Sequence, residues 1–215
     1  VLGRLIHRAG EPVIRRAVRE AMRIMGRQFV MGRTIKEALS NAREAEEDGY
    51  RHSYDMLGEA ARTMADADRY FESYANAIRA IGKASKGRSG IQAPGISVKL
   101  SALHPRYEFA KRDRVMSELV PRLTELAMMA KEADIGFTVD AEEADRLDLS
   151  LDVIEAVAMD PRLKGWEGYG LAIQAYQKRC LVLIDWLEGL AKRAGRRLCV
   201  RLVKGAYWDS EIKWA

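Results

Sequence analysis

The sequence predicts an α/β protein with a parallel sheet, built as a distorted (β/α)8 barrel of the TIM type. The first observation is that six strand-like segments alternate strictly with five helical ones. The second is that no G-x-G-x-x-G fingerprint of a doubly wound dinucleotide fold follows the first strand. A complete barrel typically needs ~250 residues, whereas this chain has 215. We therefore expect about six of the eight strands, as part of a longer polypeptide.

The chain is expected to divide into a helical lead-in over residues 1–26 and a partial barrel over residues 27–215 that holds strands 1 to 6. Pro12 suits the first turn of a helix, because a proline there gives up no intrahelical hydrogen bond. The residues that continue this helix with helical spacing are Val13, Ala17, Ala21 and Ile24. A short first strand is expected over residues 27–30.

The later elements follow the same alternation. Thr34 and Glu37 have the spacing of a capping box and predict the start of a helix. Pro121 is expected to kink a later helix, and residues 86–95 are a connector, since their glycines lack phosphate-loop spacing. The remaining strands are expected at residues 52–57, 96–101, 137–141, 169–176 and 197–203. The apolar stripes between them include Tyr70, Phe71, Tyr74, Ile78 and Ile81, then Val115, Leu119, Leu123 and Leu126, then Leu147, Leu151 and Ile154, then Leu183, Leu187 and Leu190.

The composition fits a globular protein and favours no nucleic-acid partner. Apolar residues make up 48% of the chain and charged residues 31%. The net charge is +5, but the two signs are interleaved without the basic stripe of a nucleic-acid face. No apolar run approaches the ~18 residues of a membrane-spanning helix. No signal peptide is visible and the chain starts abruptly at Val1, so we expect a cytoplasmic protein observed in part.

Cysteine and histidine usage indicates neither disulfides nor a metal. Cys180 and Cys199 stand in apolar surroundings and are expected to be reduced core residues. The three histidines have no metal-ligand spacing, so no metal site is expected.

The final strand carries a charge inside an apolar pattern. In RLCVRLV, Leu198, Val200 and Leu202 form one row that we expect to face the helices. Arg201 stands in the opposite row, which in a barrel faces the axis. The stretch continues as Lys-Gly-Ala-Tyr-Trp, an unusual ending for a strand with a clear core face.

The other strands carry polar residues at the same level of the inward row. Buried charges persist when they pair or receive a polar ligand, and Lys99 has a carboxylate on each neighbouring strand to pair with. Because barrels keep their chemistry at the C-terminal ends of the strands, we expect a functional site there. The alternative is a polar belt that only cross-links the barrel. The inward polar residues are Asp55, Lys99, Asp140, Gln174 and Arg201.

Four stretches resemble, in order, the motifs of one family: GISVKLSALHPRY, DAEEADR, IQAYQKR and RLVKGAYWDSE. They are similar to the proline dehydrogenase domain of bacterial proline utilization A, a bifunctional proline-catabolic flavoenzyme. The resemblance extends from EPVIRRAVREAMRIMGRQFV through SYDMLGEAA to the last residue. It implies FAD-dependent oxidation of L-proline to Δ1-pyrroline-5-carboxylate by hydride transfer from the proline Cδ to flavin N5. Electrons would then pass to a membrane quinone, as the first step of proline catabolism.

The resemblance also implies catalytic roles. Lys99 looks like the lysine that receives the proline carboxylate, with Asp55 as its charge partner. Arg201 resembles the arginine that hydrogen-bonds the flavin near N5, where a permanent cation stabilises developing charge. Tyr207 looks like part of the proline pocket wall, and Glu59 like the acidic half of an active-site gate.

For the cofactor, Gln174 would bond the pyrimidine edge of the flavin. The backbone over residues 203–206 would pass the ring, with glycine permitting close approach. The implied cofactor-binding residues are Asp140, Ala141, Gln174, Arg201, Val203, Lys204, Gly205, Ala206 and Trp208.

Other parts of the family pattern are expected outside this chain. Two further strands, the final helix and an arginine pair that clamps the proline carboxylate would follow Ala215. NAD would belong only to a separate aldehyde dehydrogenase domain, and a homo-oligomer with peripheral contact to the inner membrane is implied for the full-length protein. Two alternatives stay open: a non-catalytic barrel fragment, and a different barrel enzyme that acts on a phosphorylated substrate.

Overall fold

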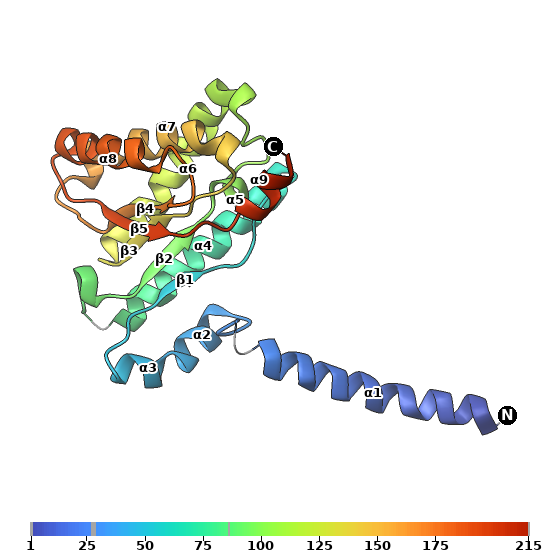
Figure 1. Ribbon diagram of the computed structural model, residues 1–215. Coiled ribbons are helices and arrows are strands. Elements are labelled where there is room, and N and C mark those ends of the chain that lie inside the picture. The colour runs from blue at the N-terminus through green and yellow to red at the C-terminus, as the bar shows by residue number, and fades with distance from the viewer. Residues whose placement is uncertain (1, 27–28, 86, 215) are drawn as a thin grey trace. The chain divides into compact units, whose positions relative to one another are not determined.

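The computed structural model describes residues 2–26, 29–85 and 87–214, and the chain forms two compact units, Val1–Tyr50 and Arg51–Ala215. The first unit is helical, with α1 (Leu2–Gly26), α2 (Ile35–Asn41) and α3 (Arg43–Glu47) (Figure 1). Helix α1 continues through Pro12, so the prediction that the helix starts there is wrong. The helix therefore continues past a residue that cannot donate a backbone hydrogen bond to it.

The expected first strand is not formed where the structure describes it. Phe29 lies in a turn, and its N–H and that of Val30 both donate to the carbonyl of Gly26, at 3.0 and 2.7 Å. These bonds close the end of α1, so the two amides have no strand to pair with. Residues 27 and 28 lie outside the described residues. The capping prediction is confirmed, because Thr34 is the N-cap of α2 and its side chain accepts from the N–H of Glu37.

The second unit is built on a parallel five-stranded sheet in the order β1-β2-β3-β4-β5. These are the five later strands expected from the sequence, and four of them end two or three residues earlier than expected. The strands are β1 (Ser53–Asp55), β2 (Gly95–Val98), β3 (Gly136–Val139), β4 (Tyr169–Gln174) and β5 (Cys199–Val203).

The strands end early because the chain turns at the edge of the sheet. After β2 the residues Leu100–Leu103 form helix α5 with all four side chains buried, so Leu100 and Ser101 are not in the strand as expected. Leu57 beyond β1 is 71% exposed rather than part of a paired strand. The side chains that directly follow these strands therefore lie on turns at the carboxyl-terminal end of the sheet.

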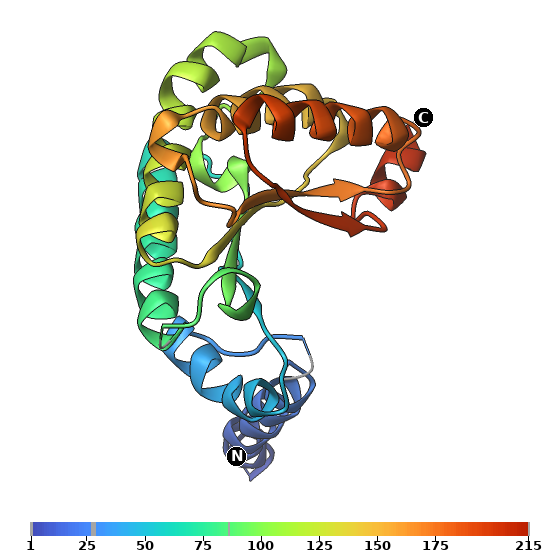
Figure 2. The same cartoon turned by 90° about the vertical axis from the view of Figure 1, so that its left-hand side faces the viewer.

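Each crossover between strands carries a helix, and the helices lie together on one side of the sheet (Figures 1 and 2). The predicted stripes of α6 and α8 are confirmed as core, with Leu119, Leu123 and Leu190 all buried. In α4 the predicted Tyr74, Ile78 and Ile81 are buried, but Tyr70 and Phe71 are only half-buried. In α7 only Ile154 of the predicted stripe is buried, and Leu147 and Leu151 are half-buried. The crossover helices are α4 (Met64–Ser85), α6 (Arg112–Glu132, which contains Pro121), α7 (Leu147–Ala158) and α8 (Cys180–Ala194). Helix α9 (Trp208–Trp214) follows β5. Short 3-10 helices occupy Gly90–Gln92, Phe109–Lys111, Ala144–Arg146 and Pro161–Leu163.

The strand β5 differs from its expected surroundings. Val200 and Leu202 are exposed by 43% and 61%, so the apolar row expected to face helices is not covered. Cys199 is exposed as well, so it is not the core residue expected, whereas Cys180 is buried. The reason is that β5 is the last strand of the sheet among the described residues.

The contact between β4 and β5 requires a glycine. A Cβ built on Gly170 would lie 1.8 Å from the carbonyl oxygen of its partner Cys199. We expect Gly170→Ala to force the two strands apart and to lower the free energy of unfolding by about 1–3 kcal/mol, as measured by urea denaturation. Gly136→Ala is the matched strand control, since its Cβ would meet only the Cα of Gly95 at 3.6 Å. Equal stability of the two variants would contradict this account.

Candidate active site

Lys99 is the centre of a charge cluster at the carboxyl ends of three neighbouring strands. Its Nζ donates to Oδ2 of Asp55 at 2.8 Å and to Oδ2 of Asp140 at 3.1 Å. The side chains of Lys99 and Asp140 are each only 15% exposed. Burial lowers the pKa of Lys99, but the hydrogen bonds and charges of the two carboxylates outweigh burial and raise the pKa above its ordinary value. Lys99 is therefore a fixed cation.

The register of the sheet explains why these three side chains meet. Asp55 ends β1 and pairs in register with Ser97 of β2, two residues before Lys99. Asp140 directly follows Val139, whose partner on β2 is Val98, the residue before Lys99. Because β1, β2 and β3 are parallel neighbours, their carboxyl ends lie at the same end of the sheet. The buried hydroxyl of Tyr74 on α4 holds the turn by accepting from the Lys99 N–H at 3.2 Å.

Arg201 reaches the same cluster from β5. Its Nη1 donates to Oδ1 of Asp140 at 3.2 Å, so Asp140 bridges the two cations. Its Nη2 donates to Oγ of Ser97 at 2.7 Å and of Ser53 at 3.3 Å. The prediction that Arg201 lies on the inward row with the other strand-end charges is confirmed. Part of the guanidinium group stays accessible, because the side chain is 40% exposed.

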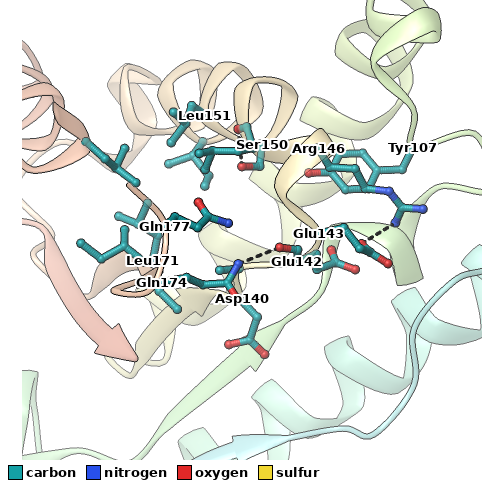
Figure 3. Close-up of a pocket in the computed structure, with 16 residues that line it drawn as sticks. Tyr107, Asp140, Glu142, Glu143, Arg146, Ser150, Leu151, Leu171, Gln174 and Gln177 are labelled. Atoms are coloured by element: carbon teal, nitrogen blue, oxygen red, sulfur yellow. Dashed lines mark hydrogen bonds and ion pairs between the residues drawn. The ribbon is translucent and has the colours of Figure 1, made fainter. Parts of the chain in front are cut away.

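Gln174 belongs to a neighbouring group of residues. Its Nε2 donates to the backbone carbonyl of Glu142 at 2.9 Å, and Figure 3 shows this bond beside a small cavity of about 20 Å³ under α7. A cavity of that size has room for about one water molecule. In the same view the carboxylate of Asp140 points away from this cavity, while Ala141 lines it. The side chain of Gln174 bonds the backbone of the segment 140–142, and this segment carries Asp140 of the Lys99 cluster. Gln174 is therefore joined to the cluster through this segment.

The chain after β5 forms the outer edge of the site. The carbonyls of Val203 and Lys204 accept from the N–H groups of Ala175 and Tyr176, at 2.8 and 3.1 Å. Gly205 follows with a φ of +121°, and a Cβ there would lie 2.2 Å from the Tyr176 ring. Glycine is thus required by this backbone conformation and by Tyr176.

Two further site residues meet at this edge. The hydroxyl of Tyr207 lies 3.5 Å from Oε2 of Glu59, toward which it donates. Burial, with the charge of Glu59 and nearby carboxylates, raises the pKa of Tyr207 and keeps its proton in place. Ala206 is exposed, and Trp208 at the start of α9 is 49% exposed.

Sequence reasoning missed two carboxylates near this site. Glu142 is buried and binds Ser101, and Glu211 of α9 receives the hydroxyl of Tyr176 and the N–H of Ala144. Strand alternation could not place Glu142, because β3 ends at Val139 and Glu142 lies in the segment that follows the strand. No sequence pattern indicated Glu211, whose partners come from other loops.

The described part of the chain contains no group of three or more His, Cys, Asp and Glu side chains arranged to hold a metal ion. Among these same residues, none of the helices is both long enough and apolar enough to cross a bilayer.

Comparison with known proteins gives a consistent result. The Bifunctional protein PutA of Salmonella typhimurium is 62% identical over 214 residues, which are 100% of this chain and 16% of that protein. A crystal structure of a PutA variant from Bradyrhizobium japonicum matches with a TM-score of 0.82 at 60% identity, over 99% of this chain and 22% of that one. PutA from Bdellovibrio bacteriovorus matches with a TM-score of 0.88 at 26% identity, over 94% of this chain and 22% of that one. The sheet thus has the TIM-barrel type of fold of the PutA proline dehydrogenase domain.

Two family models match the chain. The model for the DNA-binding domain of proline dehydrogenase matches residues 1–29. The expectation that these residues contact no nucleic acid stays a prediction. The proline dehydrogenase model matches residues 38–215, and these residues contain the whole Lys99 cluster. The chain therefore belongs to the proline dehydrogenase family.

Proposed function

We propose that this chain supplies the strand-end site for FAD-dependent oxidation of L-proline to Δ1-pyrroline-5-carboxylate. The observation that carries the proposal is a lysine held between two carboxylates beside an arginine, at the strand ends where such barrels bind substrates. The chain spans 16% of the length of the Salmonella relative. The reaction is therefore proposed for the polypeptide that contains this chain.

Lys99 is the residue that binds the substrate carboxylate. A desolvated carboxylate needs a fixed cation, and charge-assisted hydrogen bonds are about twice as strong as neutral ones. Before substrate binds, Asp55 and Asp140 provide the counter-charge that keeps Lys99 ionised. Both carboxylates are engaged by cations, so we assign no general base of the chain: the amine proton passes to solvent, or the substrate binds already deprotonated.

The residues present fit a flavin ring. Oε1 of Gln174 is buried, and no residue in the described part of the chain donates a hydrogen bond to it. An unsatisfied buried acceptor costs about 1–3 kcal/mol, and a ring N–H would satisfy it. Bound FAD would supply N5 as the acceptor of the hydride that leaves the proline Cδ. The residues proposed to hold it are Asp140, Ala141, Gln174, Arg201, Val203, Lys204, Gly205, Ala206 and Trp208.

Further expectations belong to the same proposal. Tyr207 and Glu59 line the proline side of the site, where their contact closes one wall. Residues 1–26 act as a helical lead-in and residues 27–215 as the first part of the barrel. Quinone as electron acceptor, a cytoplasmic location with peripheral contact to the inner membrane, and a homo-oligomeric full-length protein rest on the family resemblance.

The test is to purify the full-length polypeptide that contains this chain and to measure its spectrum and its proline-dependent reduction of a dye. We expect yellow protein with flavin absorbance bands, and dye reduction with L-proline but not with glycine, which lacks the ring carbon that is oxidised. A colourless protein would overturn the proposal and favour a different barrel enzyme. A yellow protein that reduces no dye with proline would contradict the substrate assignment.

A further inference from the structure

The loop between β1 and α4, residues 56–63, is held at its middle by Ser101, while its last residues, Arg62 and Thr63, bond Asp66 at the start of α4. It carries Glu59, and the two residues that follow Glu59 donate their backbone N–H groups to Ser101. Ala60 donates to Ser101 Oγ at 3.1 Å and Ala61 to the Ser101 carbonyl at 2.8 Å. Ala60 has a φ of +54°, a left-handed conformation that costs an alanine roughly 1–2 kcal/mol. The bonds to Ser101 hold the loop in a form that it would not adopt by itself.

Glu142 fixes the orientation of the Ser101 hydroxyl group. Its carboxylate accepts from the Ser101 N–H at 3.0 Å and from the Ser101 Oγ–H. A serine hydroxyl has one proton and two lone pairs, so committing the proton to Glu142 leaves a lone pair for the Ala60 N–H. Both Ser101 and Glu142 are buried, and water therefore offers little competition for these bonds.

Glu142 is itself held in place. Its backbone carbonyl receives Nε2 of Gln174 at 2.9 Å. Burial raises the pKa of Glu142, while its two hydrogen bonds from Ser101 favour the ionised form and oppose that rise. Two successive side-chain pairs thus join the segments that follow β2 and β3. They are Lys99 with Asp140, and Ser101 with Glu142.

We propose that Ser101 and Glu142 are positioning residues, which fix the loop 56–63 so that Glu59 meets Tyr207 at the proline side of the site. They touch neither substrate nor cofactor and act through Glu59. This inference rests on the proposed oxidation of proline, and it assigns to the pair an effect on proline binding rather than on the chemical step.

The test is a double-mutant cycle in the full-length holoenzyme with Ser101→Ala and Glu59→Gln. We expect Ser101→Ala to raise KM for proline about threefold to tenfold, the effect of one lost hydrogen bond, with kcat and flavin content nearly unchanged. In the Glu59→Gln background the same change should raise KM less than about twofold. Ser101→Thr keeps the hydroxyl and should restore the wild-type KM.

Ser85→Ala is the matched control, since Ser85 is equally buried and its hydroxyl donates to the Gly82 carbonyl inside α4 at 2.8 Å. It should leave KM unchanged. If Ser101→Ala does not fold, Glu142→Gln replaces it in the cycle, because an amide keeps only one of the two acceptors. An equal rise in KM in both Glu59 backgrounds, or no rise, overturns the positioning role while the proposed function stands. Wild-type protein without proline-dependent turnover would instead overturn the proposed function.

Discussion

Replacing Arg201 by methionine is expected to slow reduction of the flavin by proline about a hundredfold to a thousandfold, the usual cost of removing one preorganised donor at a site of developing charge. Arg201 is held for this task by Asp140, Ser97 and Ser53, which engage both of its terminal nitrogens. Because three strands fix the guanidinium before the reaction, it needs no rearrangement when negative charge appears. The rate is measured by stopped-flow at saturating proline.

The folded state of Arg201→Met should survive, since Asp140 keeps its bond to Lys99. Arg197→Met is the control, because Arg197 stands just before β5 and pairs with the exposed Glu167 on the surface. An unchanged rate of flavin reduction in Arg201→Met would count against its assigned place near N5. A loss of flavin from the protein would instead show that Arg201 binds the cofactor rather than assists the reaction.

Replacing Lys99 by methionine is expected to raise KM for proline about tenfold to a hundredfold, since a hydrogen bond to a charged group contributes about 1.5–3 kcal/mol. Methionine keeps the length of the stem, so the change removes the cation with little loss of packing. Asp55 then has no cation at 2.8 Å, and its repulsion of the incoming carboxylate adds to the effect. Steady-state kinetics and flavin content are measured on the same preparation.

Flavin content should stay close to that of wild type in Lys99→Met. Lys192→Met is the control, because Lys192 is exposed on α8 and pairs with Glu188 one turn away. Equal losses of proline affinity and flavin content would contradict the assignment of Lys99 to the substrate carboxylate.

The cluster was predictable because strand geometry is periodic. The alternation of side chains along each strand predicted that Lys99, Asp140 and Arg201 face the same side of the sheet. The parallel order of the strands predicted that the carboxyl ends of the strands lie together. Their pairing followed from the cost of leaving a charge buried alone. A single sequence therefore contained the information for the contacts that join Lys99 to Asp55 and Asp140.

Other features depend on contacts that periodicity does not encode. Where the structure describes it, the expected strand near Phe29 is a turn, because the amides of Phe29 and Val30 bond the carbonyl of Gly26 at the end of α1. Cys199 and Leu202 are apolar in pattern yet exposed, since burial on an edge strand depends on what covers it. Glu142 was missed because its partner Ser101 becomes recognisable only when the turn after β2 is known.

The bond from Arg201 to Ser53 has a consequence for how the protein is made. It joins residues that are 148 positions apart in the chain. Contacts between residues far apart in the chain have a loop-closure entropy cost that grows with their separation, and proteins rich in such contacts fold slowly. A ribosome-bound chain that has not yet released its fifth strand would have Lys99 paired but no guanidinium beside it. Binding of the proposed FAD would thus report that β1 and β5 have come together.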